Sequence, residues 1–525
     1  MDNSLNKKKR KYDIPLIIVS VAIVFGFVIL MAVKPESTLN GVNGAFDVII
    51  SYFGSILEVF TLLAVVVSIY FCVSPKYGKI KFGDEKPEYS MFSYIAMMTL
   101  AAVASALLYW SYTEWAYYYE TPGVGLVPES TAALEASLGY SFFHWGISGQ
   151  AIYVVIALAM SYAFYIRKVP VLQTSSVCQS MMGERLGPRT KSTLGRVIDF
   201  VVIFGILGGL GCSLGLAVPL TGGALTQVFG LKITFPVQVA IVVVIALVFT
   251  FTSFIGTKKG MKNLSNFSVI LCGAMLLYIF IAGPTSFIMK NTTNAFGWML
   301  EIFPRASLFT DPIAKTGFPE AWTMYFQAFY LNYAAMMGIF ITKISKGRTV
   351  RQLSLATLLG ISVGGWLVFS IDGSFAIHSH IEGLTDVVKL VNSGVGETGI
   401  YQVMGLLPGG KVILPMVMLL VIIGFVASSL DSASLSLSQT TQRIVDKEGN
   451  VSRGMRVFWC VILALVPLSI MFVKADFSAL KILSIIVSVP FMVIVAFMTI
   501  MLFRWLRQDE KAGKLEKYGI KKPEQ

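Results

Sequence analysis

The sequence contains little charge for its length. Only 14% of its 525 residues are Asp, Glu, Lys or Arg, whereas about a quarter of the residues of a typical soluble protein are charged. Histidine occurs three times, HExxH and the phosphate-binding P-loop are absent, and GxSxG occurs only inside apolar runs, at residues 211–215 and 360–364. The common classes of hydrolase, metalloprotease and nucleotide hydrolase therefore have no support in the sequence.

Cysteine is also scarce. The five cysteines stand singly, without a CxxC pair or the spacing of metal ligands, which argues against a disulfide framework and a structural zinc site. Cysteines packed as small apolar residues between helices are the simpler interpretation. No cofactor is expected on these grounds.

Long apolar runs are what the sequence has instead. Hydrophobic residues make up 55% of the chain, and the mean hydropathy is +0.72. The runs recur at close to the ~20 residues that a helix needs to cross ~30 Å of hydrocarbon. We therefore expect an all-α polytopic membrane protein with twelve transmembrane helices, at residues 14–33, 48–73, 91–112, 139–166, 197–220, 236–256, 267–288, 321–342, 352–376, 412–436, 455–473 and 482–503.

The net charge of +13 is best explained by membrane topology. Most Lys and Arg residues fall in alternate connecting segments, and residues 113–138 contain none. Because Lys and Arg are retained on the cytoplasmic side of a membrane, this pattern predicts two cytoplasmic termini in a cell-membrane protein. The basic tail is expected to contact anionic lipid headgroups, and no nucleic-acid partner is expected.

The spans divide the chain into a pair and two groups of five. Spans five and ten are both polar and rich in Gly or Ser, and each is the third helix of its group, as expected for inverted repeats. The predicted division is a cytoplasmic basic N-terminus (1–13), two helices with a loop (14–90), a first five-helix repeat (91–288), an outer loop with an interfacial helix (289–320), a second five-helix repeat (321–503) and a cytoplasmic basic tail (504–525).

An aromatic stripe marks the eighth span. Trp322, Tyr325, Phe326, Phe329, Tyr330 and Tyr333 fall on one face of the predicted helix. Aromatic belts lie at the membrane interfaces, whereas this stripe continues for three turns into the span. Ring faces at that depth suit a cation without hydrogen-bond donors, because cation–π attraction is then worth ~2 kcal/mol or more. Packing within the core remains the alternative.

Three further spans could contribute to a polar pathway. The fourth contains Trp145, Gln150 and Tyr153, with Gly146 and Gly149 allowing close packing. The third contains a run of small residues that includes Ala104, so a ligand or another backbone can approach it. In the tenth, "SSLDSASLSLS" places serines inside an apolar helix, where hydroxyl groups need water, ions or one another.

Several motifs together resemble one family. They are "WTMYFQAFYLNY", "ITKISKGRTVRQL", "FHWG", "TDPIAKTGFPEAWT", "CSLGLAVPLTGG" and "SSLDSAS". Over nearly the whole chain they are similar to the betaine/choline/carnitine transporters, most closely to the carnitine/butyrobetaine antiporter branch. The resemblance implies a leucine-transporter-like fold whose last ten helices form two inverted five-helix repeats. It also implies a small zwitterionic or quaternary-ammonium substrate, and frequent assembly into a homotrimer.

The resemblance also assigns residues. It implies an aromatic box of Trp145, Tyr153, Tyr330 and Tyr333, with Phe329 and Tyr117 beside it and Ala104 in the neighbouring small-residue stretch. For a coupling Na⁺ it implies Phe425, Ser428 and Ser429, facing backbone carbonyls around Val103.

The sequence departs from the family pattern at several of these places. Family members have Trp where this chain has Gln150, Gln327, Phe329 and Tyr330. Fewer indole rings weaken cation–π binding, while Gln150 adds donors and an acceptor. Carnitine-like, taurine-like sulfonated and less methylated zwitterions therefore all fit better than glycine betaine.

The coupling ion and the functional class leave alternatives open. Sodium-independent exchangers of this branch have an Arg at the position of Ser268, which favours Na⁺ symport here over exchange. A membrane sensor built on the same fold is a further alternative, and an enzyme is the weakest because catalytic groups are missing.

Overall fold

The computed structural model describes residues 12–103, 106–183, 192–255, 262–443, 451–472 and 478–518. Within these ranges the named elements are all helices or helical turns, and two isolated bridges join Tyr12 to Gln442 and Lys81 to Thr349. In the described part of the chain, eight helices are long and apolar enough to cross a membrane, or nine if one bent pair counts as a span. The expectation of an all-α protein with many membrane spans is confirmed, while the number twelve stays a prediction.

In chain order the helices can be grouped into the predicted pair and two groups of five, a division that stays a prediction. The pair is α1 (Ile14–Val33) and α2 (Pro35–Val73). The first group is α3 (Met91–Val103) with α4 (Ala106–Glu120), α5 (Thr131–Trp145) with α6 (Ile147–Ser161), α8 (Thr193–Phe229), α9 (Phe235–Ile255) and α10 (Lys262–Ala282). The second is α12 (Met324–Ile344), α13 (Val350–Leu355) with α14 (Ile361–Val368) and α15 (Ser374–Ile381), α18 (Ile413–Thr441), α19 (Arg453–Phe472) and α20 (Ser478–Lys511).

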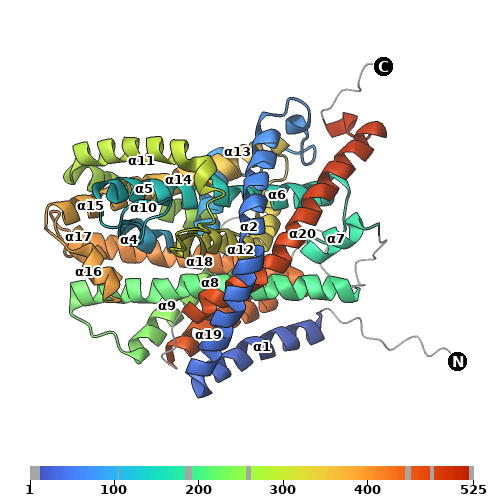
Figure 1. Cartoon of the computed structure of the whole chain (residues 1–525). Coiled ribbons are helices and arrows are strands. Elements are labelled where there is room, and N and C mark those ends of the chain that lie inside the picture. The colour runs from blue at the N-terminus through green and yellow to red at the C-terminus, as the bar shows by residue number, and fades with distance from the viewer. Residues whose placement is uncertain are drawn as a thin grey trace.

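Shorter helices lie at the two ends of the bundle (Figure 1). α11 (Thr285–Ala306), α16 (Val387–Asn392) and α17 (Gly396–Met404) gather with α15 at one end, and α7 (Thr174–Met181) lies at the other. α8 and α18 run side by side between these ends. α11 begins at Thr285, inside the seventh predicted span 267–288, because α10 already ends at Ala282.

The packing of the two groups repeats itself. α18 packs against α10 and α3, and its counterpart α8 packs against α20 and α12, the corresponding last and first helices of the other group. α9 packs against α18 as α19 packs against α8. This exchange of partners supports two related repeats. Five crossings in each would make the second repeat inverted relative to the first.

The "FHWG" motif explains a break in the fourth predicted span. Gly146 leaves the helical region with φ −97° and ψ −142°, so α5 ends at Trp145 and α6 begins at Ile147. The carbonyl groups freed before the break are satisfied by side chains: the Trp366 indole donates to Phe142 O at 2.8 Å, and the Ser148 hydroxyl donates to Phe143 O at 2.6 Å. Such replacement bonds are required when a helix is interrupted at membrane depth.

The third predicted span is also interrupted. α3 and α4 are bent by 63° relative to one another across residues 103–105. Ala104 lies outside the described residues, so its predicted role is not tested. The small side chains on both sides of the bend, Ala102 and Ala106, are buried, and the bend places the end of α3 next to α18 and α12.

The C-terminal helix extends further than predicted. α20 continues to Lys511, so the first part of the predicted tail 504–525 is helical. Asp509 there accepts a hydrogen bond from the Tyr162 hydroxyl at 2.8 Å and pairs with Arg167 at 2.6 Å. This part of the tail therefore packs against the end of the fourth span.

Candidate functional site

Four of the predicted binding residues form one cluster of rings. The Tyr153 ring on α6 lies edge-on to the Tyr330 ring on α12, with their centres 5.3 Å apart. Phe329 lies 6.1 Å from Tyr330 and 4.7 Å from Tyr333 between ring centres. All four are buried, with exposed fractions of 0% to 6%. We call Tyr153, Phe329, Tyr330 and Tyr333 the ring cluster; its members face the protein interior rather than lipid.

Two glycines allow the helices to approach closely at the ring cluster. A methyl group at Gly149 would lie 2.1 Å from the Tyr330 ring, and one at Gly209 would lie 2.6 Å from the Tyr333 ring. The Tyr333 hydroxyl bonds Ser213 Oγ at 2.6 Å and donates to Gly209 O at 3.1 Å. A glycine therefore stands at these two places, where α6 and α8 pass a ring of α12.

Several polar atoms beside the rings have no protein partner. Gln150 Nε2 donates to the Tyr330 hydroxyl at 3.4 Å, but Gln150 Oε1, the Tyr153 hydroxyl and Gln327 Oε1 are buried without a hydrogen bond in the described part of the chain. A buried polar atom without a partner is costly. A ligand with its own polar groups would satisfy these atoms, so the site suits a molecule that is both cationic and hydrogen-bonding.

Trp145 joins the ring cluster indirectly. Its ring lies 5.3 Å from Phe326 between centres, and contacts from Phe326 through Tyr325 lead to Phe329. Its indole nitrogen donates to Glu114 Oε2 at 2.7 Å. Trp145 thus reaches the ring cluster through Phe326 and Tyr325. Its place in the aromatic box stays a prediction.

The buried network around Glu114 was missed by the sequence analysis. Glu114 Oε1 accepts a hydrogen bond from the Tyr118 hydroxyl at 2.7 Å, and the same hydroxyl bonds His144 Nδ1 at 2.7 Å. His144 Nε2 lies 3.0 Å from the Thr323 hydroxyl at the start of α12. A carboxylate just beyond a predicted span was a signal that could have been used, because acidic groups at membrane depth usually have a function.

Tyr117 belongs to a separate aromatic group further along the bundle. Its ring lies 5.1 Å from Trp322 and 5.9 Å from Trp110, and Trp322 lies 6.3 Å from Phe326. These rings continue the stripe of α12 beyond the ring cluster. Their place at the start of α12 suits an approach route more than the binding site itself.

The "TDPIAKTGFPEAWT" motif forms the turn that leads into α12. Asp311 accepts hydrogen bonds from the Thr316 backbone N–H and hydroxyl, both at 2.7 Å, and these bonds hold the pKa of the Asp311 carboxyl below its usual value. Phe318 follows and packs against Tyr140, with ring centres 4.7 Å apart. A π-helical turn, Pro319–Thr323, then begins the span.

The predicted sodium ligands lie between α18, α3 and α10. The Ser429 hydroxyl is 3.0 Å from Leu100 O on α3 and 3.1 Å from Phe425 O. Ser428 Oγ lies 3.4 Å from Ser265 Oγ on α10. We call Ser265, Ser428 and Ser429 the serine cluster.

The serine cluster differs from the prediction in one respect. Leu100, one turn before Val103 on α3, supplies the carbonyl that the structure places beside Ser429. The role predicted for the Val103 carbonyl is not tested. Ser268 packs against Gly424, where an added methyl group would lie 1.9 Å from the Ser268 hydroxyl. Hydroxyl and carbonyl oxygens thus converge where a hard cation such as Na⁺ could bind.

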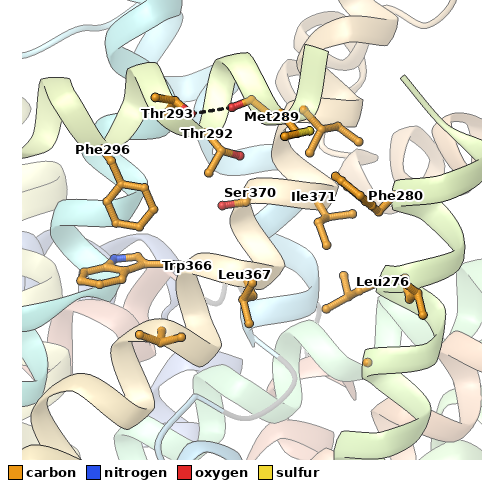
Figure 2. Close-up of a pocket in the computed structure, with 14 residues that line it drawn as sticks. Leu276, Phe280, Met289, Thr292, Thr293, Phe296, Trp366, Leu367, Ser370 and Ile371 are labelled. Carbon is orange, nitrogen blue, oxygen red and sulfur yellow. Dashed lines mark hydrogen bonds between the residues drawn. The ribbon is translucent and has the colours of Figure 1, made fainter. Parts of the chain in front are cut away.

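A cavity of about 710 Å³ lies elsewhere, under α11 (Figure 2). Phe296 and Trp366 line one side of it, and Leu276 and Phe280 line the other. None of its fourteen lining residues is charged, and none belongs to the ring cluster or the serine cluster. This apolar hollow is not a candidate for a zwitterionic ligand.

The sequence comparison finds transporters among the relatives of this chain. The chain is 34% identical to the carnitine transporter of Acinetobacter baumannii over 509 residues, covering 97% of this chain and 92% of that protein. It is 36% identical to the uncharacterized transporter YeaV of Escherichia coli over 450 residues, covering 85% and 92%. The relatives are transporters, and the enzyme alternative is set aside.

Solved structures show a more distant likeness. A Na⁺-coupled sialic acid symporter in its substrate-bound outward-open state matches with 15% identity and a TM-score of 0.45, covering 83% of this chain and 84% of that one. A manganese transporter mutant of Eremococcus coleocola matches with 11% identity and a TM-score of 0.42, covering 80% and 87%. Neither likeness is close enough to carry an argument.

The family model of the betaine/carnitine/choline transporters matches residues 15–511, almost the full length of the chain. The motifs, the buried rings on α6 and α12 and this match agree. The protein belongs to the betaine/carnitine/choline transporter family.

Proposed function

We propose that the protein transports a small zwitterion with a methylated ammonium head, of the carnitine type, by alternating access. The observation that carries the proposal is the ring cluster with its unpartnered polar atoms. Buried ring faces attract an ammonium group that cannot donate hydrogen bonds. The Tyr153 hydroxyl can donate to the anionic end of such a molecule, and Gln150 Oε1 can accept from its hydroxyl group.

The chemistry of the site separates the candidate substrates. Glycine betaine has a cationic head and a carboxylate but no hydroxyl group, so it would leave Gln150 Oε1 without a donor. Carnitine has a hydroxyl donor and a longer chain, and a relative 34% identical is a carnitine transporter. An aminosulfonate of the taurine type is the second candidate, because its ammonium group can donate directly to Gln150 Oε1.

The serine cluster supports Na⁺ as the coupling ion. Ser429 joins α18 to the end of α3, directly before the bend. A cation bound by oxygens of both helices would hold them together, and its loss would let them separate. This is how Na⁺ binding and helix movement can be linked in transporters with interrupted helices. Sodium-independent substrate exchange is the alternative.

The membrane, the orientation and the assembly of the transporter are also part of the proposal. We infer insertion in the cell membrane with cytoplasmic termini, because Lys and Arg are concentrated in the segments on that side. Assembly into a homotrimer is part of the proposal, as an expectation from the family. α7 would then lie on the cytoplasmic side and α11, α16 and α17 on the outer side.

Uptake into proteoliposomes tests the proposal. Labelled carnitine, glycine betaine and taurine would each be offered with an inward Na⁺ gradient, without Na⁺, and with unlabelled substrate inside. Concentrative uptake of carnitine that needs the Na⁺ gradient is the expected result. Uptake that needs internal substrate but no Na⁺ would favour exchange. Saturable binding without uptake would identify a sensor and contradict the transport proposal.

A further inference from the structure

Glu58 is an acidic residue inside the long helix α2, far from the ring cluster in sequence. Its side chain is 1% exposed. Neither of its carboxylate oxygens has a hydrogen-bond partner in the part of the chain that the structure describes. An ionised carboxylate is not stable at such a place unless a cation neutralises it. Acidic residues within membrane spans are usually functional for this reason.

The side chain that faces Glu58 is also acidic. Glu320 lies in the π-helical turn before α12, and its carboxylate acts electrostatically on Glu58. Glu320 Oε2 is likewise buried without a hydrogen-bond partner. One turn away on each helix, Gly54 lets Met324 approach, since an added methyl group would lie 2.6 Å from the Met324 sulfur. α2 also packs against the turn that contains Glu320, so Glu58, one turn from Gly54, and Glu320, one turn from Met324, lie where the two segments meet.

The other charged groups near α2 lie on the helices that pack against it. α1, α6 and the first part of α12 contain no charged residue. The charged residues of α13 and α20 are Arg351, Lys481, Arg504, Arg507, Asp509, Glu510 and Lys511. Arg351 donates to Ser74 O, and Glu510 pairs with Lys76. Both contacts lie just beyond the C-terminal end of α2 at Val73, away from Glu58. Glu320 is the charge that acts on Glu58.

We propose that Glu58 and Glu320 form a proton-binding carboxyl pair between α2 and the start of α12. One proton removes the charge of buried Glu58, leaves the remaining negative charge on half-buried Glu320, and supplies the O–H donor that these oxygens lack. No group of three or more His, Cys, Asp or Glu side chains suited to a metal ion occurs among the described residues, so a proton fits better than a metal cation. Glu320 is half-buried, which gives the proton a route from solvent to Glu58.

The pair links the protonation state to the helix that carries the rings. When the two carboxyl groups share a proton, a hydrogen bond holds the start of α12 against α2. When the proton leaves, two carboxylates face each other and repel. The turn Pro319–Thr323 continues directly into α12, so its movement would reach Phe329 and Tyr330. This site is independent of which zwitterion or metal ion the proposed transport cycle uses.

Infrared difference spectroscopy tests the proposal without any substrate. The full-length protein in lipid nanodiscs would be compared at acidic and alkaline pH. We expect a protonated-carboxyl band that disappears in Glu58→Gln and shifts in Glu320→Gln, because an amide replaces the partner of the shared hydrogen bond. Glu301→Gln is the matched control, since Glu301 is exposed on α11, and it should leave this band unchanged.

The outcomes are distinct. A band that both Glu58→Gln and Glu320→Gln leave unaltered would overturn the proposal. Removal of the band by Na⁺ at constant pH would also overturn it, because a metal cation would then occupy the pair. If Glu58→Gln fails to fold, the band shift in Glu320→Gln decides alone.

Discussion

The ring cluster and the serine-rich helix α18 are both polar and buried, yet their polar atoms are treated differently. Along α18 most hydroxyls bond to the helix itself: Ser432 donates to Ser428 O at 3.1 Å, and Ser434 donates to Asp431 O at 3.0 Å. Beside the rings, the Tyr153 hydroxyl and Gln150 Oε1 have no hydrogen-bond partner among the residues that the structure describes. Buried polar side chains are thus satisfied by the protein itself in one place and available to a ligand in the other.

This difference shows how to recognise a binding site among buried polar groups. A serine in a helix can satisfy itself through the carbonyl three or four residues before it, so a run of serines says little by itself. Within α18, Ser428 and Ser429 reach α10 and α3, as Ser436 reaches Met336 O on α12, so contacts to other helices single out these three serines. Tyr and Gln side chains are too long for such local bonds, and when unpartnered they indicate an external ligand.

The largest effect is expected from filling the space beside Tyr330. Gly149→Ala would place a methyl group 2.1 Å from the Tyr330 ring, and that ring is 1% exposed and cannot turn away. Overpacking of this kind costs about 1–3 kcal/mol, so we expect carnitine affinity to fall up to about a hundredfold. Calorimetric titration of the purified protein measures this.

A matched control keeps that test specific. Gly297→Ala changes a glycine on α11 that has nothing within 4 Å of an added methyl group. Its affinity should equal that of the unaltered protein. Equal affinity in Gly149→Ala as well would place the substrate away from Tyr330.

The second effect separates the Tyr330 ring from its hydroxyl. Tyr330→Ala removes a face for the ammonium head and should weaken binding by about 2 kcal/mol, or about thirtyfold. Tyr330→Phe keeps the ring and loses only the 3.4 Å contact with Gln150, so it should cost less than a factor of five. Equal losses in the two variants would show that the hydroxyl, and not the ring face, binds the substrate.

The serine cluster gives the third test. Ser429→Ala removes the hydroxyl that joins α18 to Leu100 on α3. We expect the Na⁺ concentration for half-maximal uptake to rise by about five- to tenfold, the effect of losing a contact worth about 1 kcal/mol. Ser434→Ala, on the same helix but bonded to its own backbone, should leave Na⁺ activation unchanged. If both variants behave alike, the Na⁺ site lies elsewhere.

The sequence predicted the periodic features of the molecule better than its interruptions. Apolar runs and the stripe of α12 depend on local pattern, and the structure places Phe329, Tyr330 and Tyr333 on a common buried face. Gly146 was expected to allow close packing, and an added methyl group there would lie 2.4 Å from Phe142 O; that it also interrupts the fourth span was not expected. The π-helical turn Pro319–Thr323 has no comparable local signal.

The polar contacts between distant segments were the least predictable part. Glu114 accepts a hydrogen bond from Trp145 on another helix, and Glu58 lies on a helix that packs against the turn containing Glu320, 262 positions further along the chain. Which carbonyl of α3 lies beside Ser429 depends on how the helix bends, and the structure places Leu100 O there, one turn before Val103, whose own role stays a prediction. Such pairings follow from helix packing, which one sequence does not specify.

The smallest expected effect concerns selectivity and sharpens the contrast between the two regions. Gln150 is buried, with an unpartnered Oε1 beside Tyr153 and Tyr330. Gln150→Trp would replace an amide by an indole, the best ring for cation–π contact, and would remove the acceptor for a substrate hydroxyl or ammonium group. The ratio of glycine betaine to carnitine affinity should therefore rise about three- to tenfold, as measured by competition against labelled carnitine. Gln150→Leu separates the two causes: loss of carnitine affinity without a gain for betaine would assign selectivity to the amide alone. An unchanged ratio in both variants would mean that Gln150 only fills space, and the unpartnered oxygen would then carry no information about the substrate.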